Sequence, residues 1–138
     1  MFLSELNEGQ KRSYLALATR MILADGDVAP EEDEILESIK SELGDGITAP
    51  PEEVFGSTNA DSFDTRRSRV IAVLEILVMA HSDSHLHIDE SAVLSEICSA
   101  LEINDEDLDA MTAWAKSLVA GDDEAALRAA AEALMAKA

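Results

Sequence analysis

Apolar residues recur at helical spacing near the start of the chain. The apolar face of this first segment consists of Tyr14, Leu15, Ala18 and Ile22. Asn7, followed three residues later by Gln10, resembles a capping box, in which each side chain bonds the backbone N–H of the other residue. Together these features predict a helix from about residue 8 to 24.

A second amphipathic segment follows the acidic stretch "ADGDVAPEEDE". Its apolar stripe consists of Ile35, Leu36, Ile39 and Leu43. Pro30 suits the first turn of a helix, where its missing N–H costs nothing, and Gly44 suits a helix end. We therefore expect a second helix from about residue 30 to 43.

Residues 44–63 interrupt the helical pattern with three glycines and the pair Pro50 and Pro51, which is typical of a linker. Within it, "PPEEVF" predicts a short helical turn that packs Val54 and Phe55 against the core.

The next helix is predicted from Asp64 to about Ser82 and is apolar on most sides, which indicates a central, mostly buried element. Its apolar run Val70–Ala80 carries one charge, Glu75, and is far shorter than the roughly 20 residues of a membrane-spanning helix. Basic residues at a helix start oppose the macrodipole, so we expect the ones here to pair with acidic neighbours. They are Arg66, Arg67 and Arg69.

Three further helices are predicted, at about residues 89–101, from Asn104, and after "GDD" at 121–123. Hydrophobic residues make up 47% of the chain and aromatic residues only 4%, which favours helices over a sheet. We therefore predict one all-α domain over residues 1–138, with six to seven helices and C-terminal helices at about 105–137.

Charge narrows the possible partners of the chain. The formal net charge of −19 repels nucleic-acid phosphates and anionic lipids, so we expect no nucleic-acid partner and no direct membrane insertion. The start of the chain lacks the features of a signal peptide, and a cytoplasmic protein is expected.

Cys98 is the only cysteine and has Leu94 and Leu101 at helical spacing, which predicts a small buried residue.

The sequence repeats itself at an offset of 58 positions without a gap. This offset aligns Asp25 with Asp83, Val28 with Leu86, Glu31 with Asp89, Glu32 with Glu90, Ile35 with Val93, Leu36 with Leu94, Ile39 with Ile97 and Leu43 with Leu101. The repeat predicts two helical hairpins, at about 8–43 and 64–101, related by a pseudo-two-fold axis. Such an arrangement would bring both acidic turns to comparable places.

The pattern Ala-Asp-Gly-x-Val-x-Pro-x-Glu between two amphipathic helices, repeated in degenerate form, resembles the TerB-like tellurite-resistance family. The similarity covers about residues 4–115, and the second turn departs from the pattern at Ser84, where the first has Gly26. The residues that carry it are Ala24, Asp25, Gly26, Val28, Pro30 and Glu32, then Asp83, Leu86, Asp89 and Glu90.

The resemblance implies an all-α fold of helical hairpins and a non-enzymatic role in tellurite resistance or in wider chemical or phage stress. Related modules occur beside other domains, including a membrane-anchored DnaJ-like co-chaperone. The resemblance therefore implies protein partners, which could belong to a membrane-associated stress complex. The acidic turn residues of the family have been proposed to chelate metal. Here they are Asp25, Glu32, Asp83 and Glu90.

Neither turn has all the ligands of a calcium loop. With Gly26 at the glycine of position 6, Asp25 falls at position 5 and Glu32 at position 12. Positions 1 and 3 fall on Met21 and Leu23 in the first turn and on Met79 and His81 in the second. If the turns face each other, their four carboxylates could form one shared site for calcium or magnesium. Helix-end preferences alone also explain each turn.

The second turn, "HSDSHLHIDE", contains all three histidines of the chain: His81, His85 and His87. Imidazoles beside Asp83 would suit zinc better than calcium, although histidines among acidic residues need no metal. The expected cofactor is thus a divalent cation, calcium, magnesium or zinc, or none.

Catalytic parts are scarce, because the chain has neither a nucleophile-elbow serine nor a phosphate-binding glycine loop. The sequence favours a non-enzymatic acidic helical module that binds a divalent metal at its duplicated turns. Two alternatives stay open: an interaction domain without metal, and a metal-dependent hydrolase that uses the second turn.

Overall fold

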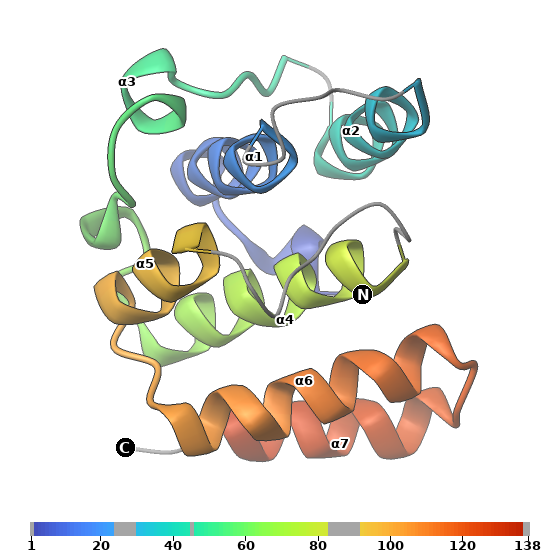
Figure 1. Cartoon of the computed structure of the whole chain (residues 1–138). Helices are drawn as coiled ribbons and strands as arrows, with labels where there is room; N and C mark the ends of the chain where they lie inside the picture. Colours follow the sequence, from blue (N-terminus) through green and yellow to red (C-terminus); the bar gives the residue numbers. More distant parts are fainter. Residues whose placement is uncertain (1, 24–29, 45, 83–91, 137–138) are drawn as a thin grey trace.

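The computed structural model describes residues 2–23, 30–44, 46–82 and 92–136, with backbone only at residues 30–33, 35 and 82. Every regular element in these ranges is a helix, which confirms the predicted all-α class (Figure 1). The α-helices are α1 (Glu8–Leu23), α2 (Pro30–Leu43), α3 (Pro51–Val54), α4 (Arg66–Ser82), α5 (Ala92–Ala100), α6 (Asp105–Val119) and α7 (Glu124–Met135), and two 3-10 turns are η1 (Leu3–Glu5) and η2 (Ala60–Ser62).

Local signals set the helix boundaries. The capping box at the start of α1 is confirmed: the Asn7 backbone N–H donates to Gln10 Oε1 at 3.0 Å, and the Gln10 N–H donates to Asn7 Oδ1 at 2.9 Å. Helix α2 has its predicted bounds, and Gly44 follows it with φ of +111°. At α6, Asn104 Oδ1 accepts the Asp107 N–H at 2.7 Å. These bonds satisfy amide groups that a helix start leaves without an intrahelical partner.

Helix α4 lies across the middle of the molecule, with α1 and α2 on one side and α6 and α7 on the other (Figure 1). Every residue from Val70 to Leu77 is buried, as the sequence predicted for a central helix. The C-terminal helices α6 and α7 form a hairpin. Trp114 on α6 links them, because its Nε1–H donates a hydrogen bond to Leu127 O on α7 at 2.6 Å. The core therefore lies around α4, against which α1, α6, α7 and η1 pack.

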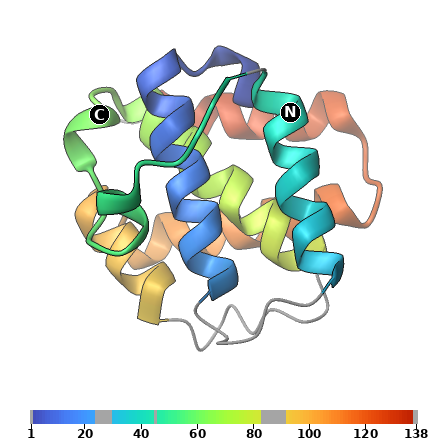
Figure 2. The same cartoon turned by 90° about the horizontal axis from the view of Figure 1, so that it is seen from above.

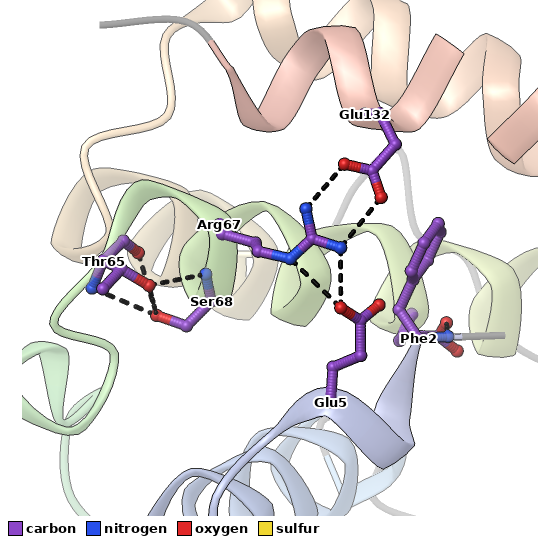
Figure 3. Close-up of polar contacts among 7 residues, drawn as sticks. Phe2, Glu5, Thr65, Arg67, Ser68 and Glu132 are labelled. Atoms are coloured by element: carbon purple, nitrogen blue, oxygen red, sulfur yellow. Dashed lines mark hydrogen bonds and ion pairs between the residues drawn. The ribbon is translucent and has the colours of Figure 1, made fainter. Parts of the chain in front are cut away.

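The three arginines at the start of α4 pair with acidic residues, as predicted. Arg67 lies between η1 and α7, where its guanidinium bonds Glu5 and Glu132, each at 2.6 Å (Figure 3). The other two pairs join α4 to the second half of the chain, Arg66 with Asp107 at 2.9 Å and Arg69 with Glu102 at 3.2 Å.

The expected burial of Phe55 is wrong, because this side chain is 83% exposed. Helix α3 forms as predicted and packs against α1, where Ser13 Oγ donates to Glu53 Oε1 at 2.7 Å. Two residues turn a helix by about 200°, so Phe55 lies on the side opposite Glu53. A polar contact therefore orients this short helix, and Val54 is only half-buried.

Candidate functional site

The predicted metal residues fall largely outside the part of the chain that the structure describes. Asp25, Asp83, Glu90, His85 and His87 all lie there. Glu32 lies in α2, where the structure describes its backbone but not its side chain. The shared carboxylate site and the histidine site thus stay predictions.

The described backbone nevertheless fixes the helix ends that border both turns. Figure 2 shows the end of α1, the start of α2, the end of α4 and the start of α5 towards the same side of the molecule. A shared site would need both turns on one side of the molecule, and the turns themselves lie outside the described residues. The pseudo-two-fold relation itself stays a prediction.

Residues at position 1 of each calcium-loop alignment belong to the core. Met21 is 3% exposed and Met79 is 5% exposed. His81 is half-buried in the last turn of α4. Among the described residues, no group of three or more His, Cys, Asp or Glu side chains is arranged to hold a metal ion.

A polar cluster that the sequence analysis missed joins α1, the linker and α5. Arg20 donates to Glu96 Oε2 and to Thr58 Oγ1, each at 3.0 Å. Thr58 donates to the same carboxylate from its backbone N–H at 2.9 Å and from its hydroxyl at 2.6 Å. Burial raises the pKa of Glu96, but the bonds from Thr58 and Arg20 outweigh it and hold the pKa below 4.5.

A second polar group, also missed, lies inside the molecule beside α4. Glu75 is 6% exposed, and its Oε1 accepts the Phe2 backbone N–H at 2.9 Å. Tyr14 on α1 is 1% exposed. Burial, and then the negative charges of Glu75 and Glu42, raise the pKa of Tyr14 well above 10.0, so its hydroxyl stays protonated.

These groups line a cavity of about 230 Å³ between η1, α1, α2 and α4. Its lining consists of Leu3, Tyr14, Ser38, Ile39, Glu42, Glu75, Val78 and Met79. The signal in the sequence was Glu75, the single charge inside the apolar run Val70–Ala80. The cavity is lined by two carboxylates, two hydroxyl groups and four apolar side chains.

Cys98 is a buried thiol, 5% exposed, as predicted. Burial, and secondarily the charge of Asp105, raises its pKa to about 11. A thiol in this state is a poor nucleophile at neutral pH, so its role is packing.

Neither a protein-family model nor a curated protein nor a solved structure matches the chain. Within the described ranges, the helices are too short or too polar to cross a membrane. The functional argument therefore rests on the residues themselves.

Proposed function

We propose that the protein is a non-enzymatic acidic helical module of the tellurite-resistance or stress-response type, which binds a divalent cation at its duplicated turns. The observation that carries this proposal is the gap-free repeat that aligns Asp25 with Asp83 and Glu32 with Glu90. The helix ends on either side of both turns support it, because they lie towards one side of the molecule (Figure 2). Four carboxylates are suitable ligands for calcium or magnesium, and His85 and His87 would add donors for zinc.

The module would act in the cytoplasm by binding another protein. A net charge of −19 favours a basic partner surface. In a membrane-associated stress complex, the membrane anchor would belong to that partner. Cation binding would reduce the mutual repulsion of the four carboxylates and so change the charge of the surface that the partner contacts.

Calorimetric titration of chelator-treated protein with calcium, magnesium, zinc and manganese tests the metal site. We expect binding tighter than about 1 mM for at least one ion, with a loss of at least tenfold in Asp25→Asn and in Asp83→Asn. Asp109→Asn is the matched control, since Asp109 is exposed on α6 and carries the same charge. Binding weaker than millimolar for all four ions, or equal loss in the control, would contradict the proposal.

An interaction domain without metal is the second candidate. It is favoured by the exposed Phe55 at the end of α3, which would give a partner an apolar contact, while the net charge of −19 favours basic residues around that contact. This candidate requires salt-sensitive association that survives Asp25→Asn and Asp83→Asn but is lost in Phe55→Ala.

A further inference from the structure

Three polar residues from separate segments form one closed cluster. Arg20 lies in the last turn of α1, Thr58 lies in the linker and Glu96 lies in the middle of α5. Arg20 donates to Thr58 Oγ1 and to Glu96 Oε2, each at 3.0 Å. The backbone N–H and the hydroxyl of Thr58 donate to the two oxygens of Glu96. Each residue of the Arg20–Thr58–Glu96 cluster therefore bonds both of the others.

The cluster opens as a unit and at a cost. Glu96 takes part in three of the four bonds, so a movement of α5 away from α1 breaks them together. The Arg20 side chain is only 10% exposed, whereas that of Glu96 is 35% exposed. Separation would leave the guanidinium charge without its carboxylate in a largely desolvated position.

The cluster joins the helix before the first acidic turn to the helix after the second. Helix α1 ends at Leu23 and α5 begins at Ala92, and both ends lie towards the same side of the molecule (Figure 2). Helix α5 packs against α1 more than against any other described element, and the Arg20–Glu96 ion pair lies between them. The cluster therefore holds the spacing of these two helices.

The sequence repeat does not account for the cluster. At the offset of 58 positions, Arg20 aligns with Val78 and Glu96 aligns with Ser38, so the ion pair has no counterpart. A feature needed for packing of the repeated unit would be expected in both copies. The cluster is instead present on one side of the repeat only, where it also binds the linker.

We propose that the Arg20–Thr58–Glu96 cluster couples cation binding at the acidic turns to the docking of the linker, with Thr58 and Glu96 as positioning residues. This inference rests on the function proposed above. Without a cation, repulsion between the two turns opposes the close approach of α1 and α5 that the cluster maintains. A bound cation favours the same approach and hence the closed cluster. The coupling is reciprocal, so the closed cluster raises cation affinity by the factor by which the cation stabilises it.

The linker is then the part of the surface that responds to the cation. Phe55 lies three residues before Thr58 in this linker and is 83% exposed. A protein partner that contacts the linker would therefore distinguish the cation-bound chain from the cation-free chain.

Thr58→Val tests the coupling without a change of charge, because it removes the hydroxyl and keeps the backbone N–H. The whole chelator-treated chain is titrated by calorimetry with calcium, magnesium, zinc or manganese chloride. We expect the tightest of these ions to bind about fivefold more weakly to Thr58→Val than to the unsubstituted chain. Thr58→Ser keeps the hydroxyl, and its affinity should stay within about twofold.

Thr112→Val is the matched control for Thr58→Val. Thr112 is also half-buried, and its hydroxyl bonds Leu108 O within α6. Its cation affinity should stay within about twofold of that of the unsubstituted chain.

Hydrogen exchange of the Thr58 amide measures the reverse effect in the unsubstituted chain. This N–H donates to Glu96 Oε1 at 2.9 Å, so its exchange requires the cluster to open. A saturating cation concentration is expected to slow the exchange about fivefold, the same factor as in the affinity measurement. The Gln10 amide is the control, because it donates to Asn7 Oδ1 at the opposite end of α1 from Arg20. Its exchange rate should change by less than about twofold.

Three results would overturn the coupling and leave the cation site in place: equal affinity in Thr58→Val and Thr112→Val, equal loss in Thr58→Val and Thr58→Ser, or a Thr58 amide that responds to the cation no more than that of Gln10. If the unsubstituted chain binds none of the four ions tighter than about 1 mM, the proposed function fails and the coupling fails with it. The exchange measurement needs no variant, so it decides the question even where Thr58→Val does not fold.

Discussion

Three carboxylates on different helices connect segments that are far apart in the sequence. Glu75 on α4 holds the backbone of Phe2, Glu96 on α5 holds Thr58 and Arg20, and Asp107 on α6 holds Arg66. Glu96 accepts three such bonds, whereas Glu75 and Asp107, both buried side chains, each accept one from a distant segment. Most of the described acidic residues are exposed, so a carboxylate stabilises the fold mainly where it accepts hydrogen bonds from a distant segment.

Asp107 and Glu102 show how burial sets the value of an ion pair. The Asp107 side chain is 6% exposed and pairs with Arg66, whereas the Glu102 side chain is 80% exposed and pairs with Arg69. We expect Asp107→Asn to lower the free energy of unfolding by about 2 kcal/mol, because Arg66 loses its partner in a partly desolvated site. Glu102→Gln should cost less than about 0.5 kcal/mol.

Urea unfolding followed by Trp114 fluorescence measures both values, since this buried residue is the only tryptophan. Equal losses in the two variants would contradict the burial argument.

Glu96 gives the fold a pH-dependent contribution. Its folded-state pKa lies below 4.5, so the stabilisation is complete above the unfolded-state pKa and is lost as pH falls through the folded value. We expect Glu96→Gln to be less stable than the unsubstituted chain at pH 7, and the difference to shrink as the pH falls from about 5 towards 3. Paired urea titrations at several pH values measure it.

Glu52→Gln, an exposed change of the same kind on α3, is the control for Glu96→Gln. A gap between Glu96→Gln and the unsubstituted chain that stays constant on acidification would refute the pKa argument.

At the scale of elements, the sequence predicted what local chemistry decides. The capping pair Asn7 and Gln10, Pro30 in a first helical turn and Gly44 after a helix each act on neighbouring backbone groups, so no tertiary contact was needed to place α1 and α2. The partners of the α4 arginines were predicted only as acidic, because their identities depend on packing. The predicted burial of Phe55 was wrong for the same reason, because it too depends on how α3 packs against α1.

Two phenylalanines of the linker provide a matched test of this lesson. Phe55 is 83% exposed and Phe63 is 0% exposed. We expect Phe63→Ala to lower the free energy of unfolding by about 3 to 5 kcal/mol, because it leaves a cavity in the core. Phe55→Ala should stay within about 0.5 kcal/mol. The two variants can be compared by the same urea titration, and a loss above 2 kcal/mol in Phe55→Ala would mean that its side chain is buried in solution.

At the scale of the whole molecule, the cavity could not be predicted from the sequence. Its lining comes from η1, α1, α2 and α4, and only their packing around the central helix brings Tyr14, Glu42 and Glu75 together. Glu75 was visible as one charge in an apolar run, but that position alone does not predict a cavity. The acidic turns are the opposite case, because the repeat in the sequence predicts them, and they lie outside the part of the chain that the structure describes.

The net charge of −19 makes the stability of the whole molecule depend on ions. Sodium chloride should raise the melting temperature, because screening weakens the repulsion among acidic residues. Calcium or magnesium chloride at the same ionic strength should raise it further if the turns bind the cation in the folded state alone. The additional stabilisation is about 2.7 kcal/mol at a free cation concentration one hundred times the dissociation constant.

The double variant Asp25→Asn with Asp83→Asn separates screening from binding. It should retain the sodium chloride effect, since it removes only two of many charges, and lose the additional effect of the divalent ion. The control is Asp109→Asn with Glu124→Gln, which removes two exposed charges from α6 and α7. Thermal unfolding of the three proteins in matched salts measures the difference. If the divalent ion stabilises all three equally, its effect is nonspecific and the turns only connect helices.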